Sequence, residues 1–216
     1  MCTKTDFTEL DYINALYGAV KDELTEKRLS HVVSVAKTAY RICCDMKLSE
    51  SDTKKTVTAA FLHDITKEKT TEEHIALCQK YGIELTENEL KSPSVLHQIT
   101  GAPYAKEKLP LMVDDDVCDM ISKHCTGGGG MTLCEKIVFL SDYIEPERRH
   151  EACKTLNDFY FNKRNGENIE KHLDKAVLLA YDNTVRYLNN KGGFVHPSTL
   201  LGREDIIKSL NLERKI

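Results

Sequence analysis

The chain has 216 residues, 41% of them apolar, which is enough for one sizeable hydrophobic core, and we expect a single domain over residues 1–216. Its 30 lysines and arginines and 34 aspartates and glutamates are interspersed and leave a net charge of −4. No basic stripe indicates nucleic acid or an anionic membrane surface, so the charge pattern excludes these two classes of partner.

The opening residues and the cysteines bear on the cellular compartment. Residues 1–20 lack the apolar run of a signal peptide, and no stretch approaches the ~18 apolar residues of a membrane span. We therefore expect a cytoplasmic protein without a membrane segment. The eight cysteines include no CxxC pair, and we expect them to be reduced thiols rather than a disulfide framework.

Helical signals follow one another along the whole chain. Apolar residues recur at helical spacing over residues 10–24 and 29–39, and Ser49 or Ser51 can cap a third helix that ends at a His63-Asp64 pair. Capping boxes predict helix starts at Thr70, Thr86 and Thr132, and Pro146 stops the last of these three helices. Pro93 is expected to start a helix with His97 in its second turn, and a further helix ends near His124, before glycines 127–130. A long helix is expected from Asn168 to Gly192, and residues 196–210 form the last one. Nine or ten helices and no strand alternation predict an all-α fold.

Six polar residues stand out because each lies on or beside an apolar stretch: His31, His63, Asp64, His97, His124 and Asp142. A buried carboxylate is costly without a partner, so the two aspartates require cations, hydrogen bonds or a metal. Neutral imidazoles and carboxylates bind first-row divalent metals, and this set fills two neighbouring sites if one aspartate bridges them. Asp64 is the natural bridge, because it has two oxygens and lies where a helix ends.

Taken one at a time, these residues have ordinary explanations. A single helical histidine is more often a core or surface residue than a metal ligand, and an aspartate near a helix end is usually solvated. The other histidines, His74, His150, His172 and His196, keep that explanation. The joint pattern of the six favours a two-metal centre.

The order of His31, the His63-Asp64 doublet and Asp142 resembles the HD superfamily of metal-dependent phosphohydrolases, all-α proteins named for that doublet. His97 and His124 resemble the ligands of the subset with a second metal site. Shorter motifs are similar to those of the symmetrical bis(5′-nucleosyl)-tetraphosphatases: RLSHVVSVA, LHDITK, LHQITGA, HCTGGGGM and SDYIEPER. The resemblance covers roughly residues 25–205.

This resemblance implies an HD-domain helical bundle with a metal centre between the core helices, a core of about residues 25–190, and residues 191–216 packed on it. It implies a di-iron enzyme that hydrolyses diadenosine tetraphosphate symmetrically to two ADP, and it favours a homodimer. One metal would be held by His31, His63, Asp64 and Asp142, and the other by Asp64, His97 and His124. Ligand chemistry leaves manganese, cobalt, nickel and zinc as alternatives to iron.

Phosphoanhydride hydrolysis needs a nucleophile, neutralisation of oxygen charge and a held leaving group, and two metals that share a water or hydroxide can supply all three. Asp64, as the bridge, and Lys67, about one helical turn later, are the expected catalytic residues. Lys67 is also expected to bind phosphate, although it lies in a KEK tract where a solvated lysine is the alternative.

Further substrate contacts are expected from both sides of the centre. Arg148 follows the Asp142 helix and can grip phosphate, and Arg28 is a weaker candidate one turn before His31. The loop that begins with Thr126 and Gly127 is expected to line the substrate, because glycine amides can approach a ligand closely. A flexible surface loop is the alternative.

Two departures from the family pattern and several functional alternatives remain. Cys125 stands where the family usually has threonine, and Glu204 follows Arg203 where asparagine is expected. The alternatives are another HD-type nucleotide phosphohydrolase or phosphodiesterase, a di-iron oxygenase, and a catalytically silent nucleotide sensor. Lys67 and the EPERR motif favour phosphate chemistry.

Overall fold

A computed structural model describes residue 7 and residues 11–211, and these residues form helices and loops without a strand. The all-α prediction is therefore confirmed for this part of the chain. In chain order the helices are α1 (Asp11–Val20), α2 (Glu26–Asp45), α3 (Glu50–Leu62), α4 (Thr71–Tyr81), α5 (Glu87–Lys91), the 3₁₀ helix η2 (Pro93–Val95), α6 (Leu96–Lys108), α7 (Asp115–Lys123), α8 (Leu133–Ile144), α9 (Glu151–Asn162), α10 (Ile169–Lys191) and α11 (Pro197–Ser209).

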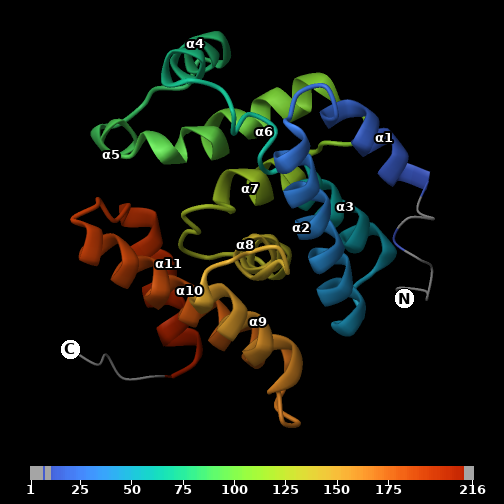
Figure 1. The fold of residues 1–216 in the computed structure, drawn as a ribbon, viewed down its shortest axis with the longest axis vertical. Coiled ribbons are helices and arrows are strands. Elements are labelled where there is room, and N and C mark those ends of the chain that lie inside the picture. Colours follow the sequence, from blue (N-terminus) through green and yellow to red (C-terminus); the bar gives the residue numbers. More distant parts are fainter. Residues whose placement is uncertain (1–6, 8–10, 212–216) are drawn as a thin grey trace.

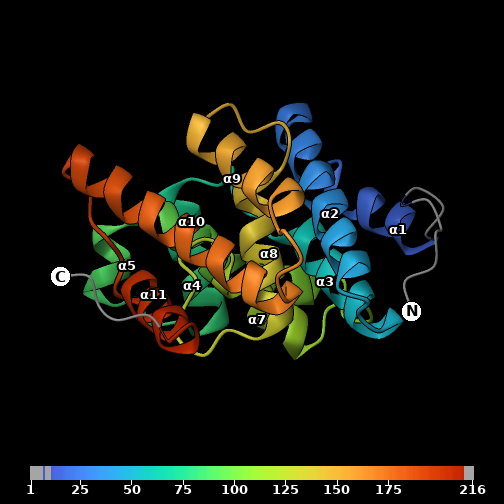
Figure 2. The ribbon, with the colours of Figure 1, turned by 90° about the horizontal axis from the view of Figure 1, so that it is seen from below.

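Helix α8 lies at the centre of the bundle (Figures 1 and 2). It contacts α2 and α3 on one side and α10 on the other, and α7 and α9 also pack against it. Helix α6 packs on α7 and carries α4, whereas α11 packs on α10. The central helices thus hold the core, while α4, α5 and α11 form its periphery.

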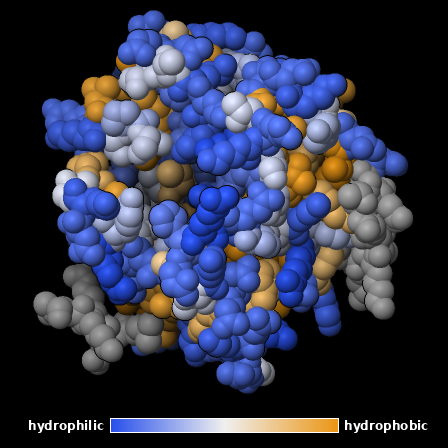
Figure 3. All heavy atoms as spheres, viewed as in Figure 1, coloured by the Kyte–Doolittle hydropathy of each residue, from blue (hydrophilic) through white to orange (hydrophobic). Residues whose placement is uncertain are grey.

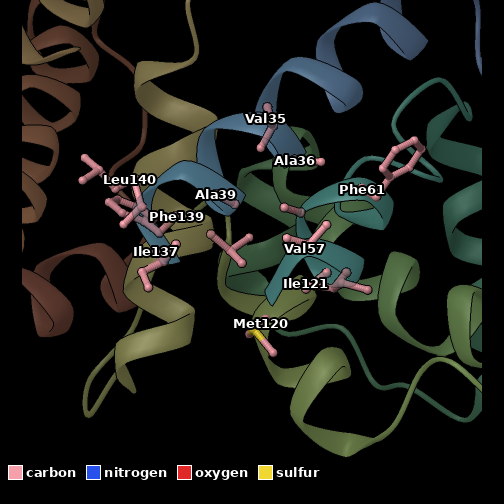
Figure 4. Close-up of a cluster of buried hydrophobic side chains, with 14 of the residues drawn as sticks. Val35, Ala36, Ala39, Val57, Phe61, Met120, Ile121, Ile137, Phe139 and Leu140 are labelled. Carbon is pink, nitrogen blue, oxygen red and sulfur yellow. The ribbon is translucent and has the colours of Figure 1, made fainter. Parts of the chain in front are cut away.

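The core is made of aliphatic and aromatic side chains from most of the helices, and Figure 4 labels its residues from α2, α3, α7 and α8. Val35 and Ala39 of α2, Val57 of α3, Ile121 of α7 and Leu140 of α8 are fully or almost fully buried. The face seen in Figure 3 is mostly hydrophilic, with apolar residues in small scattered groups. Within the described residues, no helix combines the length and apolar character needed to cross a lipid bilayer.

Local sequence signals account for most helix boundaries. All three expected capping boxes form, at Thr70, Thr86 and Thr132, and the side chain of Ser49 caps α3. Gly192 ends α10 with a φ of 64°, in the left-handed region that glycine adopts without a steric penalty. Helix α8 ends at Ile144, two residues before Pro146, as the helix-stopping effect of proline predicts.

Four expectations are corrected. The described residues hold eleven α-helices, and the unexpected one is α9, whose N-cap His150 makes no side-chain capping bond. The first helix is shorter than the apolar pattern over residues 10–24 indicated, because α1 ends at Val20. Leu10, where that pattern begins, lies outside the described residues. His97 lies in the first turn of α6, because the preceding residues form η2. Finally, six of the described cysteines are free thiols, as expected, whereas Cys44 is disulfide-bonded, which the cysteine spacing did not indicate.

Candidate metal centre

Helix ends bring the six singled-out residues into one cluster. Their positions are the second turn of α2 for His31, the C-cap of α3 for His63 with Asp64 next, the first turn of α6 for His97, the C-cap of α7 for His124 and the last turn of α8 for Asp142. The four histidines and Asp64 are buried, and the Asp142 side chain is 19% exposed. Residues more than 100 positions apart in the sequence therefore share one small volume.

The two oxygens of Asp64 face different pairs of histidines. Its Oδ1 lies 3.3 Å from His97 Nε2 and 3.6 Å from His124 Nε2. Its Oδ2 lies 3.5 Å from His63 Nε2 and 3.6 Å from His31 Nε2. Asp64 thus stands between two sets of donor atoms, in the position that a bridging carboxylate requires.

Asp142 completes one of these sets and not the other. Its Oδ1 lies 3.1 Å from His31 Nε2 and 3.7 Å from His63 Nε2. On the opposite side of Asp64, the Nε2 atoms of His97 and His124 are 3.0 Å apart. The cluster is therefore asymmetric, with two carboxylates on one side and only the shared one on the other.

All four histidines direct Nε2 inward because their Nδ1 atoms are engaged elsewhere. Nδ1 of His63, His97 and His124 donates at 2.7 Å to the backbone carbonyl three residues earlier, and His31 Nδ1 lies 3.2 Å from Glu145 Oε1. A hydrogen bond at one ring nitrogen fixes the tautomer and leaves the other nitrogen as a ligand.

The protonation states differ among the histidines of the cluster. Burial lowers the pKa of His63 to about 4 and that of His97 well below its usual value, so both rings are neutral at pH 7. Burial opposes charge on His31 too, but Asp142 and Glu145 outweigh it and raise the pKa of His31 to about 9. The pKa of Asp64 would rise through burial alone, yet the facing His63 and His124 hold it well below its ordinary value.

The donor set fits divalent metal ions. Two ligand atoms bound to one such ion at ~2.1 Å are ~3.0–3.4 Å apart, close to the separations measured within each set. The Nε2 atoms of His31 and His63 are buried without a hydrogen-bond partner among the described residues, as expected of atoms that serve as ligands. His31, His63 and Asp64 form one group with ligand atoms within 4.8 Å of one another, and Asp64, His97 and His124 form another.

Three cationic side chains surround the cluster. Arg28 donates from Nη1 to Asp64 Oδ2 at 2.7 Å, and Arg148 donates from Nη2 to Asp142 Oδ1. The Lys67 ammonium lies 3.2 Å from His97 Nε2. The two arginines thus pair with the two carboxylates of the cluster, and Lys67 lies against one of its histidines.

In the loop after His124, some residues line a cavity and others do not. Thr126 is buried and lines a cavity next to the cluster, as does the Cys125 thiol, whose pKa burial raises to about 11. Gly127 is not among the residues that line this cavity. It has a φ of 62°, and a Cβ there would lie 1.9 Å from the Tyr181 hydroxyl, so packing explains its glycine.

A cavity of about 540 Å³ extends from the cluster toward α9, α10 and α11. His124, Asp142 and Arg148 line it at the cluster. Tyr187 and Phe194, which are 58% and 37% exposed, belong to the same wall. This volume lies within the range for small-molecule sites, and aromatic faces there can stack on a planar base.

Sequence reasoning missed two residues that support the cluster. Glu145 is buried, faces His31 and accepts a hydrogen bond from the Ser34 hydroxyl at 2.7 Å. Gln98 is 5% exposed and accepts hydrogen bonds from the backbone after His124. Two sequence signals could have pointed to these residues. Glu145 stands next to a helix-stopping proline, and Gln98 stands next to a candidate ligand.

Comparisons with known proteins agree with this geometry. The HD domain family matches residues 28–147. The symmetrical bis(5′-nucleosyl)-tetraphosphatase of Bacillus subtilis is 32% identical over 186 residues, which is 85% of this chain and 91% of that protein. The enzyme of the same name from Halalkalibacterium halodurans is 32% identical over 84% of this chain and 89% of its own. A crystal structure from Clostridium acetobutylicum, described as a predicted HD superfamily hydrolase involved in NAD metabolism, is 30% identical with a TM-score of 0.79, covering 91% of this chain and 97% of that one.

Proposed function

The chain belongs to the HD-domain family with symmetrical bis(5′-nucleosyl)-tetraphosphatases as its relatives, and on this basis we propose that it hydrolyses dinucleoside polyphosphates. Diadenosine tetraphosphate is the proposed substrate. Water adds to one phosphorus of the central anhydride, the bond between that phosphorus and the bridging oxygen breaks, and two ADP leave. The position of Asp64 between two pairs of histidines is the observation that carries the proposal.

The proposed ligand sets follow the two oxygens of Asp64. His31, His63, Asp64 and Asp142 would hold one metal, and Asp64, His97 and His124 would hold the other, with iron as the proposed metal. When bound, such a pair lowers the pKa of a water nucleophile and neutralises charge on phosphate oxygens. The protein supplies neutral imidazoles for this centre, because burial keeps His63 and His97 unprotonated through a lowered pKa.

The substrate's phosphates would be bound by the three surrounding cations. Arg148 pairs with Asp142 and lines the cavity, so its guanidinium can contact a phosphate while the nucleoside extends toward Tyr187 and Phe194. Lys67 and Arg28 lie beside Asp64 and are proposed to bind the other half of the phosphate chain. Lys67 in particular can neutralise charge that develops on the leaving phosphate, and Thr126 on the cavity wall is a further proposed contact.

The decisive experiment identifies the products. Protein purified without chelator is incubated with diadenosine tetraphosphate, and the nucleotides are separated by chromatography. We expect ADP as the sole product, whereas equal amounts of ATP and AMP would contradict symmetrical cleavage. A panel of nucleoside triphosphates, cyclic dinucleotides and NAD, compared by kcat/KM, tests whether the protein is another HD-type phosphohydrolase or phosphodiesterase. Equal turnover with and without oxygen excludes an oxygenase.

Two finer parts of the proposal have their own measurements. Elemental analysis of the purified protein tests whether it holds two irons per chain, against manganese, cobalt, nickel or zinc. Light scattering at several protein concentrations tests the proposed homodimer. Tight nucleotide binding with both metals present and no turnover would instead identify a sensor.

A further inference from the structure

A buried glutamine connects two helices that each carry a histidine of the cluster. Gln98 follows His97 in the first turn of α6 and is 5% exposed. Its Oε1 accepts from the backbone N–H groups of Cys125 and Thr126, both at 3.1 Å, and its Nε2 donates to Thr126 Oγ1 at 2.9 Å. Because backbone N–H groups only donate, the atom facing both of them must be the amide oxygen, which fixes the side-chain orientation.

These hydrogen bonds lie one residue away from two candidate ligands. Gln98 is adjacent to His97, and Cys125 is adjacent to His124, whose Nε2 is 3.0 Å from that of His97. None of these hydrogen bonds involves either imidazole ring. It therefore sets the distance between the two backbones, and through them the distance between the two rings.

The other hydrogen bonds of this pair reach only one of the two histidines, and Thr66 Oγ1, for example, donates to the His97 carbonyl at 3.0 Å. His97 Nδ1 donates to Ser94 O and His124 Nδ1 donates to Ile121 O, so each of these bonds orients one ring on its own segment. Thr199 Oγ1 donates to Thr126 O at 3.0 Å and extends the connection to α11. Among the described side chains, Gln98 is the one whose amide bonds tie the start of α6 to the turn after α7.

We propose that Gln98 is a positioning residue for the metal site formed by Asp64, His97 and His124, and that it acts on this site selectively. The inference rests on the proposed two-metal centre. The opposite site draws on α2, α3 and α8, whereas the hydrogen bonds of the Gln98 side chain all go to Cys125 and Thr126, so that site should be unaffected. Outer-shell partners of this kind typically change metal affinity 10- to 100-fold.

The test compares wild type with three variants by calorimetric titration with Mn²⁺ in the absence of substrate. Gln98→Met keeps the side-chain volume and removes the hydrogen bonds to Cys125 and Thr126, whereas Gln98→Glu keeps an acceptor for both amides. Asn168→Ala is the control, because it removes the side-chain cap of α10 and lowers stability away from the cluster. Gln98→Asn, one methylene too short to reach the turn, replaces Gln98→Met if that variant does not fold.

For wild type we expect two Mn²⁺ per chain. In Gln98→Met one site should keep its affinity for Mn²⁺, and the affinity of the other should fall about 10- to 100-fold. Gln98→Glu should lose much less affinity at that site, and Asn168→Ala should bind Mn²⁺ as wild type does. Hydrogen exchange at the Cys125 and Thr126 amides should accelerate in Gln98→Met alone. Two unchanged sites in Gln98→Met, or an equal loss at both, would overturn the inference while leaving the proposed function intact. A wild-type protein that binds fewer than two metals and releases no ADP would overturn both.

Discussion

Replacing Asp64 by alanine should abolish metal binding at both sites, because each oxygen of this one side chain faces a different histidine pair. Metal centres of this kind contribute several kcal/mol to a hydrolytic transition state, so ADP release should fall at least about a hundredfold. In the metal-free protein the substitution should lower the free energy of unfolding only moderately. Arg28, the partner of Asp64, keeps 29% of its side chain exposed and can turn to water, so we expect a loss of about 1–2 kcal/mol in unfolding free energy.

A matched control separates metal binding from general destabilisation. Glu135 is also a buried carboxylate, 3% exposed, and it pairs at 2.6 Å with Lys123, which is 32% exposed, much as Asp64 pairs with Arg28. Glu135→Ala should therefore cost similar stability and retain both metals. Metal content by elemental analysis and Tm with and without metal decide the outcome. Equal metal content in wild type and Asp64→Ala would refute the bridging position.

The other predictions concern Arg148, Gly127 and His74. Arg148→Gln should raise KM for diadenosine tetraphosphate about tenfold or more in steady-state assays, since a charge-assisted phosphate contact is lost; an unchanged KM contradicts this role. Gly127→Ala should cost about 2–4 kcal/mol in denaturant unfolding, because the new Cβ meets the Tyr181 hydroxyl at 1.9 Å and φ is positive. Burial lowers the pKa of His74 below 6.5, so the unfolded chain binds the proton first and stability falls as pH drops below 6.5. His74→Gln, which retains a polar contact for Thr100, should lessen this slope between pH 7.5 and 5, and an identical slope counts against it.

The fold was predictable from sequence where caps and periodicity agreed. Thr70, Thr86 and Thr132 each have a glutamate three residues on, and each begins a helix as expected. Helix α9 escaped prediction because its start at His150 has no side-chain capping bond. The packing of α8 between α2 and α10 could not be predicted either, because helical periodicity shows which face is apolar and not which helix covers it.

The residues of the candidate site also include some that could be predicted from sequence and some that could not. The six cluster residues were recognisable because polar side chains beside apolar stretches need partners, and their order resembled a known family. Glu145 and Gln98 act through hydrogen bonds to elements distant in sequence, to His31 in one instance and to the turn after α7 in the other. Such pairings are set by helix packing. The proposed metal roles remain predictions until metal content is measured.

The charge of the proposed site contrasts with that of the whole chain. The protein carries a net charge of −4, yet two divalent ions on Asp64 and Asp142 would leave the cluster at about +2, with Arg28, Lys67 and Arg148 adding further positive charge around it. A local positive site on an acidic protein attracts a compact polyanion and repels an extended one, because a long nucleic acid would also meet the acidic surface. A tetraphosphate chain flanked by two nucleosides is short enough to place its charge entirely at the centre. This charge distribution therefore favours a small polyphosphate over a long nucleic acid as the proposed substrate.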